Sequence, residues 1–161
     1  MKTILFALLL VTTQIFAGPV IPPPIPINPA VTPQTLDKTI CSKNEEGKSA
    51  HWTASVRPPD AVTMKQKLAA MAKLGIPASD AGLYEWDHFL PIELGGMPND
   101  PRNFRLQAYA DKEPHGLDTQ ARKKDVIETR LAHLICAGKI PLREAQVCIW
   151  NDWRACAKAH P

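Results

Sequence analysis

Residues 84–107 constrain the fold of this chain more than any other segment. The stretches 83–86 and 104–106 have the composition of short strands, and a long loop joins them. Within that loop, Gly95 and Gly96 permit the reversal that brings the second stretch back beside the first. A helical pattern follows directly, so residues 83–137 predict the order strand, loop, strand, helix. We therefore expect an α+β domain built on a single hairpin.

Further helices are expected on both sides of this hairpin. Thr63 is expected to cap the first helix, and a short strand over residues 51–56 precedes it. Asp118 is expected to cap the helix after the hairpin, and Pro141 to open the last one. Residues spaced at the helical period are expected to face inward: Leu68, Met71, Ala72 and Leu74, then Ile127, Leu131, Leu134 and Ile135, then Leu142, Ala145, Ile149 and Trp153.

The chain begins with the pattern of an export signal. Lys2 precedes an apolar run that is too short to span a membrane, and Ala17 supplies the small residue of a cleavage site. Residues 1–17 are therefore interpreted as a signal peptide. Prolines crowd residues 18–38, which excludes a helix and favours an extended tether without a packed core. One domain is expected over residues 39–161, secreted or periplasmic and without a transmembrane segment.

Net charge does not identify a partner. The formal charge of the whole chain is +3, whereas domains that bind nucleic acid through charge alone are strongly basic. The basic residues near the hairpin lie among acidic ones, so the local field is diluted.

Four cysteines, an even number in an exported chain, predict two disulfide bonds. The absence of a Cys-x-x-Cys pair argues against a metal cluster. Cys41 lies far from the other three, so its bond ties the N-terminal part of the domain to the C-terminal half and contributes about 4 kcal/mol through loop closure. On one continuous helix, Cys148 and Cys156 would be about 12 Å apart, too far for a bond. They can pair only if the last helix stops before Cys156.

The segment with Asp87-His88, a proline, a Gly-Gly pair and Asn103 resembles the core of His-Asn-His (HNH) nucleases, the ββα-metal fold. This resemblance covers residues 84–134, and residues 39–153 are similar to a family of small secreted bacterial proteins that carry this core. It implies a small ββα-metal core with additional flanking helices, stabilised by disulfides.

The same resemblance implies the pairing Cys41–Cys136, because the family has a matching two-cysteine pattern. Cys148–Cys156 is then the second bond, which requires the last helix to end near Trp153.

Three residues of the hairpin acquire expected roles from the resemblance. His88 is the general base that generates hydroxide, because a neutral imidazole accepts a proton near neutral pH. Asp87 offers a carboxylate oxygen to a divalent metal, Mg²⁺ or Mn²⁺ ahead of Zn²⁺. Asn103 takes the place of the central Asn, whose amide bonds backbone across the loop and holds the histidine in orientation. Neighbouring strand residues point to opposite faces, so Asp87 and His88 can share a site only if the strand ends there.

The helix after the hairpin departs from the HNH pattern, since it has no His or Asn near its start. Extending its apolar face backward places Gln120 and Lys124 toward the hairpin. Gln120 is then a metal ligand, and Lys124 either contacts phosphate or replaces a metal charge. Arg105 is the second candidate for binding phosphate. Further site candidates are His115, Asp125 and Glu128, the last two within the family signature Lys-Asp-x-x-Glu, for which a solvated helix face is an equal alternative.

Two functions follow from these expectations. The first is an exported, metal-dependent HNH-like endonuclease that hydrolyses phosphodiester bonds in nucleic acid, DNA in preference to RNA, as a monomer. The second is a noncatalytic module on the same fold that binds nucleic acid or another envelope component. The first is the preferred interpretation, and the second is the alternative that the missing third motif residue and the modest charge support.

Overall fold

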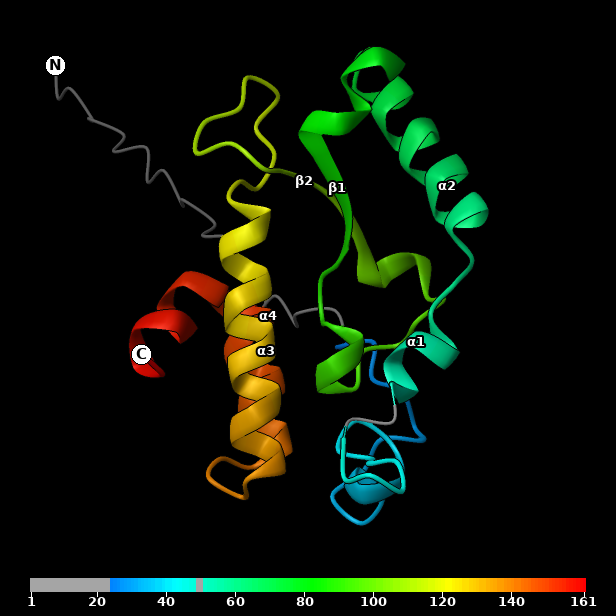
Figure 1. Ribbon diagram of the computed structural model, residues 1–161. Coiled ribbons are helices and arrows are strands. Elements are labelled where there is room, and N and C mark those ends of the chain that lie inside the picture. The colour runs from blue at the N-terminus through cyan, green and yellow to red at the C-terminus, as the bar shows by residue number, and fades with distance from the viewer. Residues whose placement is uncertain (1–23, 49–50) are drawn as a thin grey trace, which may run out of the picture.

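The computed structural model describes residues 24–48 and 51–161. It is an α+β structure in which one antiparallel hairpin lies between helices (Figure 1). The strands are β1 (Tyr84–His88) and β2 (Phe104–Ala108), and His88 pairs with Phe104 and Asp87 with Arg105. The expected hairpin is therefore present. Strand β1 begins one residue later and ends two residues later than expected, and β2 ends two residues later.

Four α-helices and four 3₁₀ turns complete the described part of the chain. The α-helices are α1 (Trp52–Val56), α2 (Asp60–Lys73), α3 (Ala121–Cys136) and α4 (Leu142–Ala159). The 3₁₀ turns are η1 (Leu36–Lys38), η2 (Ala78–Leu83), η3 (Ile92–Leu94) and η4 (Pro101–Asn103). Turns η3 and η4 lie in the loop that joins the two strands.

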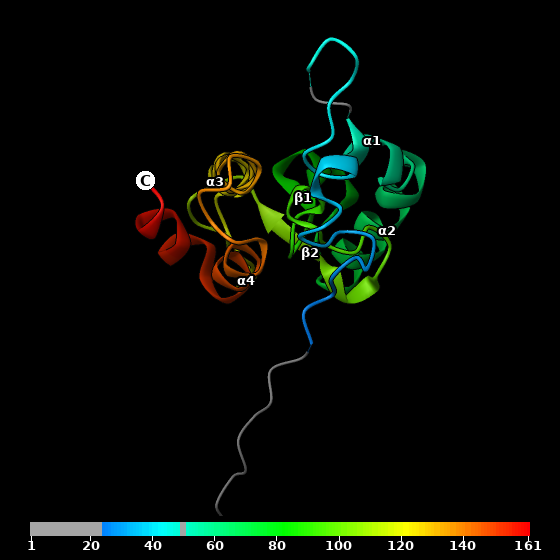
Figure 2. The same cartoon turned by 90° about the horizontal axis from the view of Figure 1, so that it is seen from below.

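Helix α2 lies on one side of the hairpin, and the pair α3 and α4 lies on the other (Figure 2). Each side has its own apolar core. The α2 side buries Met71, Ile76, Tyr84, Leu106 and Ala108. The larger core lies between α3, α4 and the hairpin loop, and includes Leu90, Leu94, Ile127, Leu131, Ile135, Ala145, Ile149 and Trp153.

The inward faces expected for α3 and α4 are largely confirmed. Ile127, Leu131 and Ile135 are buried in α3, and Leu134 is half-buried. All four residues expected to face inward from α4 are buried. The prediction for α2 was wrong at three of its four positions, because Met71 is buried while Ala72 is exposed and Leu68 and Leu74 are 36% and 42% exposed. A two-stranded sheet is too narrow to cover a whole helix face.

The expected starts of two helices were also wrong. Helix α2 begins at Asp60, after Pro59, so Thr63 lies inside its first turn. Helix α3 begins at Ala121, because Gln120 has a φ of 65° and cannot continue a helix backward. Asp118 does not cap α3, because arginine and tryptophan side chains occupy its carboxylate.

Residues 51–56 are not a strand. They contain the short helix α1, although their tryptophan, threonine and valine favour β structure. Among the described residues the sheet has only two strands, so this segment has no strand beside it to accept its backbone hydrogen bonds. A helical turn satisfies those groups within the segment itself.

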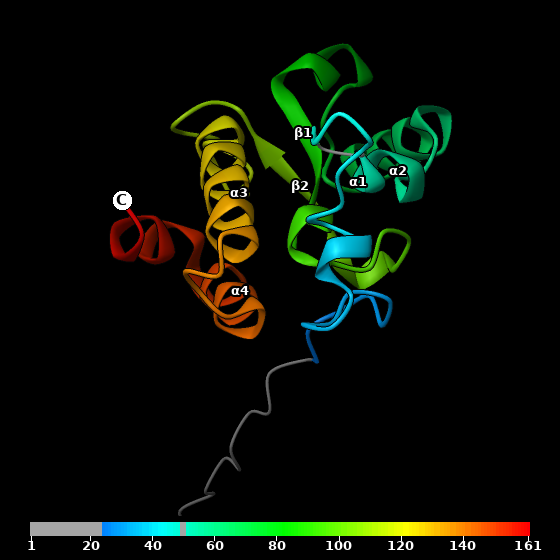
Figure 3. The same ribbon diagram turned by 60° about the horizontal axis from the view of Figure 1, so that its bottom comes forward.

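The described part of the expected tether, residues 24–38, packs onto the domain instead of extending away from it (Figure 3). Val31 is 3% exposed and belongs to the larger core. The N–H of Asn28 donates to the carbonyl of Gly95 at 2.8 Å, and the N–H of Met97 donates to that of Pro26, also at 2.8 Å. The aliphatic residues between the prolines supply this contact. The expected signal peptide, residues 1–17, lies outside the described residues.

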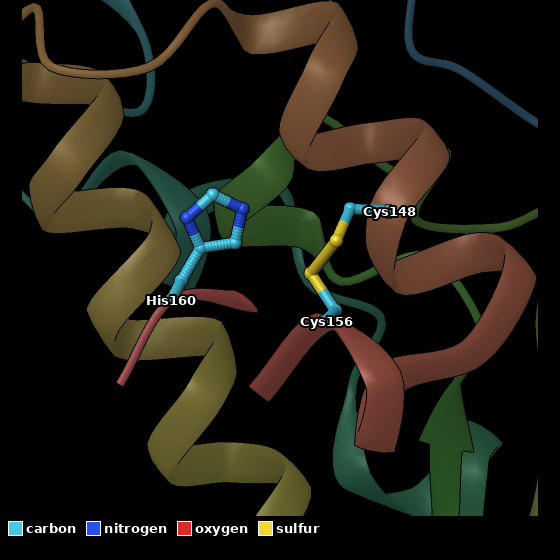
Figure 4. Close-up of side chains that lie close together, drawn as sticks. All are labelled: Cys148, Cys156 and His160. Atoms are coloured by element: carbon cyan, nitrogen blue, oxygen red, sulfur yellow. A yellow bond between two sulfur atoms is a disulfide. The ribbon is translucent and has the colours of Figure 1, made fainter. Parts of the chain in front are cut away.

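Both disulfides of the expected pairing are present, Cys41–Cys136 and Cys148–Cys156. The second is possible because Asp152, with φ −162° and ψ 103°, breaks the helical path of α4. Figure 4 shows the two sulfurs joined across this break, where the Cα atoms are 5.3 Å apart. Two disulfides are typical of proteins in an oxidising, non-cytoplasmic environment. No helix within the described ranges is long and apolar enough to cross a bilayer.

Candidate functional site

Strand β1 ends at His88, and this ending brings His88 and Asp87 to one site. Both side chains are buried. Nε2 of His88 lies 3.0 Å from the carbonyl oxygen of Pro98. A carbonyl oxygen can only accept, so Nε2 carries the hydrogen of the neutral ring and Nδ1 is the nitrogen that can take a proton. The ring also packs at 4.3 Å, between centroids, against its cross-strand partner Phe104.

Asn103 closes the loop that follows His88. The side chain is fully buried. Its Oδ1 accepts from the N–H of Leu90 at 2.8 Å, and its Nδ2 donates to the carbonyls of Leu90 and Met97, each at 2.9 Å. The N–H of Phe89, which follows His88 directly, donates to the carbonyl of Asn103 at 2.6 Å. Asn103 thus bonds backbone across the loop and fixes the segment that carries the imidazole.

Lys124 of α3 reaches the centre of the site and is 1% exposed. Its ammonium contacts Oδ2 of Asp87 at 2.8 Å, donates to the backbone carbonyl of His88 at 3.0 Å, and donates to Oε1 of Glu128. Burial would lower the pKa of Lys124, but the charges of Asp87 and Glu128 outweigh it and raise this pKa above its ordinary value. The lysine is therefore charged.

A chain of ion pairs continues from Asp87 toward α4. Nε of Arg105 lies 3.6 Å from Oδ2 of Asp87, and Nη1 of Arg105 lies 2.9 Å from Oδ2 of Asp118. Asp118 also accepts from Arg154 at 2.8 Å and from Trp153 at 3.1 Å. Arg105 is thus engaged within the protein, with its guanidinium 4.4 Å above the ring of Phe89.

His88 lines two neighbouring cavities. The first, of about 210 Å³, is strongly polar, and its lining includes Asp87, Glu85, Glu93, Asp125, Glu128 and Arg57. The second, of about 280 Å³, is lined in part by Lys67, Trp86 and Tyr109. Both cavities share Arg57, Glu85 and His88 in their walls. The histidine therefore stands at the junction of an acidic hollow and a mixed aromatic and basic one.

Burial lowers the pKa of the histidine at this junction and raises the pKa values of two nearby carboxyl groups. Burial lowers the pKa of His88, which keeps the imidazole neutral near neutral pH. Burial, with the charges of Asp125 and Asp87, raises the pKa of Glu85 to about 7. Burial also raises the pKa of Glu128, against the opposing effect of the Lys124 charge. The neutral imidazole of His88 thus shares a cavity with Glu85, a carboxyl group that is partly protonated near pH 7.

The predicted site residues are only partly brought together. Lys124, Asp125 and Glu128 reach the site from α3, so Asp125 and Glu128 lie at the site and not on a solvated helix face. The amide of Gln120 instead donates to Asp111 at 3.0 Å, and Nδ1 of His115 lies 2.7 Å from Glu113. Gln120 and His115 do not line the cavity beside Asp87.

Three charged residues of the acidic cavity were not predicted: Glu85, Glu93 and Arg57. Glu85 had a detectable signal, because it precedes Asp87 by two positions and a strand places such residues on one face. Arg57 had none, since it comes from the turn between α1 and α2, far from the hairpin in sequence.

Asp87 and Gln120, the expected ligands of a divalent cation, do not lie around a common point. Oδ2 of Asp87 pairs with the ammonium of Lys124, and Gln120 donates to Asp111. Within the described ranges, one group of three Cys, His, Asp or Glu side chains has its ligand atoms within 4.8 Å of one another: Cys148, Cys156 and His160. Figure 4 shows that both sulfurs of this group belong to the disulfide, so neither is a thiolate that could bind a metal.

Comparisons of this chain with protein-family models, with curated proteins and with solved structures found no match. The geometry around His88 and Lys124 therefore carries the functional argument.

Proposed function

We propose that this protein is an exported HNH-like endonuclease that hydrolyses phosphodiester bonds in nucleic acid, DNA in preference to RNA, with His88 as general base. The observation that carries the proposal is the placement of His88. It ends β1, a backbone carbonyl holds its Nε2, its Nδ1 is the free base, and its ring lines two cavities. The order β1, loop, β2, α3 and the Asn103 bonds across the loop support a ββα core of this type.

The chemistry of hydrolysis can be assigned to groups of the cavities. Water attacks phosphorus while Nδ1 of His88 takes its proton, and the bond from phosphorus to the leaving oxygen breaks. Glu85, which shares both cavity walls with His88 and retains a proton near pH 7, donates that proton to the leaving oxygen. No step requires a divalent cation at Asp87, because Lys124 contacts that carboxylate.

The larger cavity has features that suit a nucleic-acid strand. Arg57 is a positive group that can meet phosphate, and Lys67 adds a second charge in the same wall while donating to the carbonyl of Tyr84 at 2.6 Å. Trp86 and Tyr109 are aromatic rings on which bases can stack, Tyr109 on the face that Arg122 does not cover. Trp86 itself is stacked on Phe104, with ring centroids 5.5 Å apart, which holds its plane. Arg105 is not assigned to phosphate, because Asp118 and Asp87 engage it.

The proposal is tested with the purified mature protein on plasmid DNA, single-stranded DNA and RNA, in EDTA and with Mg²⁺ or Mn²⁺. We expect cleavage that His88→Ala reduces by about 10²-fold or more and that His133→Ala, which removes an exposed histidine of α3, leaves unchanged. Cleavage by His88→Ala at the wild-type rate would mean that another group is the base or that a contaminating enzyme is present.

The ion pair between Asp87 and Lys124 favours a second candidate, the noncatalytic binding module, because it occupies the carboxylate that a catalytic metal would need. In that case fluorescence anisotropy would detect binding of labelled DNA, and no condition would produce cleavage. Loss of binding in Arg57→Ala and Lys67→Ala, without any turnover by the wild type, would establish this alternative.

A further inference from the structure

The position of Lys124 needs a physical explanation. A buried ammonium is costly unless oxygen atoms replace its hydration shell. Three oxygens surround it here, two from the end of β1 and one from α3. The ammonium donates hydrogen bonds to the backbone carbonyl of His88 and to Glu128, one helical turn along α3. Oδ2 of Asp87 lies 2.8 Å away as an ion pair outside hydrogen-bond geometry, so its contact is electrostatic.

The same environment is of the kind that a hard divalent cation selects. Carboxylate and backbone carbonyl oxygens are the preferred ligands of Mg²⁺ and Ca²⁺. Lys124 thus places one fixed positive charge among the oxygens at which a cation would otherwise bind. Because these oxygens surround its ammonium and the side chain is 1% exposed, the lysine acts on Asp87 and on the backbone at His88, and not on a phosphate from solution.

We propose that the ammonium of Lys124 takes the place of a divalent cation, so that no metal binds at Asp87 and the site works without one. The catalytic part of this inference rests on the function proposed above. Lys124 is then a positioning residue that holds the strand end carrying His88.

The first test is cation binding, which does not depend on activity. Mn²⁺ titrated into the wild-type protein should keep the spectrum of free Mn²⁺ in electron paramagnetic resonance. Lys124→Met keeps the length of the side chain and removes its charge, so the freed oxygens should now bind Mn²⁺. Lys123→Met is the matched control, because this neighbouring lysine is exposed and pairs with Asp111.

The second test is thermal stability in EDTA and with Mn²⁺. Lys124→Met should melt roughly 10 °C or more below the wild type in EDTA, because it leaves the buried Glu128 without its cation and Asp87 with Arg105 alone, at 3.6 Å. About 1 mM Mn²⁺ should recover a large part of this loss, because a ligand that binds only the folded state stabilises it. The melting temperatures of the wild type and of Lys123→Met should not respond to Mn²⁺.

Each outcome decides the inference. Wild-type binding of Mn²⁺ that Asp87→Asn removes would overturn it, and so would a Lys124→Met protein that binds no Mn²⁺. If Lys124→Met does not fold in EDTA, refolding in Mn²⁺ supports the inference, and wild-type binding lost in Asp87→Asn still overturns it.

Cleavage assays separate this inference from the proposed function. Wild-type cleavage in EDTA supports both. Cleavage only with Mn²⁺, together with Mn²⁺ binding at Asp87, overturns the role of Lys124 and leaves the hydrolase intact. No cleavage in any condition, with the Mn²⁺ results as expected, rejects the hydrolase and leaves Lys124 in the place of the cation.

Discussion

At His88, one hydrogen bond and the surrounding burial determine both the tautomer and the charge of the ring. The carbonyl of Pro98 requires a hydrogen on Nε2, and burial lowers the pKa, so Nδ1 is a free base across the neutral range. A surface histidine would have neither property. The role proposed for this residue therefore depends on the loop that covers it as much as on the imidazole itself.

Replacing His88 with alanine should reduce cleavage by about 10²–10⁴-fold, the usual contribution of a general base. Wild-type activity should fall with decreasing pH only below the ordinary histidine value of about 6.5, because burial lowers the His88 pKa. The check is a pH–rate profile of initial cleavage rates, with His133→Ala as control. A profile whose acidic limb lies above pH 7 would contradict the assignment of this limb to His88.

Glu85 should make the folded protein less stable as the pH rises. Its pKa is raised from 4.5 to about 7 in the folded state, first by burial, so between these values the folded state holds more protons than the unfolded one. The free energy of unfolding then decreases with rising pH through this window and is lowest above it. Glu85→Gln cannot ionise, so its stability relative to wild type should increase between about pH 5 and about pH 8.

Urea denaturation at several pH values measures this difference. Glu45→Gln is the matched control, because Glu45 is exposed and distant from the cavity in sequence. A difference between Glu85→Gln and wild type that stays constant with pH would show that Glu85 titrates normally.

At the scale of elements, the loop between β1 and β2 depends on a close approach of its own backbone, where Gly96 lies against Leu90. An added Cβ on Gly96 would overlap the carbonyl oxygen of Leu90 and would lie 2.7 Å from its carbonyl carbon and 2.9 Å from Nδ2 of Asn103. Ile27 also pairs with Gly96 as an isolated bridge. The glycine is therefore required by close approach of the backbone, and the bonds of Asn103 depend on it.

Gly96→Ala should destabilise the protein by several kcal/mol, roughly 3 or more, because backbone must move and buried hydrogen bonds of Asn103 are strained or lost. Gly82→Ala is the matched control, since a Cβ at Gly82 meets nothing within 4 Å. Chemical denaturation of the two variants gives the comparison. Equal stability of both would show that the loop can relax around a methyl group.

At the scale of the whole molecule, the two disulfides constrain very different lengths of chain. Cys41–Cys136 joins residues 95 positions apart and links the N-terminal segment to the end of α3, whereas Cys148–Cys156 spans only 8 positions within α4. In the chain-entropy account, a bond stabilises by restricting the unfolded chain, and the effect grows with the loop it closes.

Replacing both cysteines of the long loop with serine should therefore cost about 4–5 kcal/mol, against about 2–3 kcal/mol for the short one. The urea midpoints of the two double-serine variants show which disulfide contributes more to stability. Peptide mapping without reduction provides the accompanying check on connectivity, and a peptide that links Cys41 to Cys148 or Cys156 would exclude this pairing.

The sequence by itself determined the features that depend on local pattern. Strand-forming stretches flanking Gly95 and Gly96 predicted the hairpin, and helical periods identified Leu131 and Ile149 as core residues. Extending one of those periods backward placed Lys124 inward, because a helix repeats its faces regularly. The spacing of Cys148 and Cys156 required the helix to stop before Cys156 if the two are bonded. The structure meets this requirement with a break at Asp152, after which α4 continues to Ala159.

Tertiary structure alone decided which partners the polar groups have. Nothing near Lys124 in sequence shows that it meets Asp87, or that Asp118 binds Arg105 and Arg154 in place of capping α3. Residues 24–38 appeared too rich in proline to pack, yet they cover the hairpin loop. Local pattern reports which face of an element is apolar. The partner of a charge depends on which distant element lies opposite, and only the folded chain determines that.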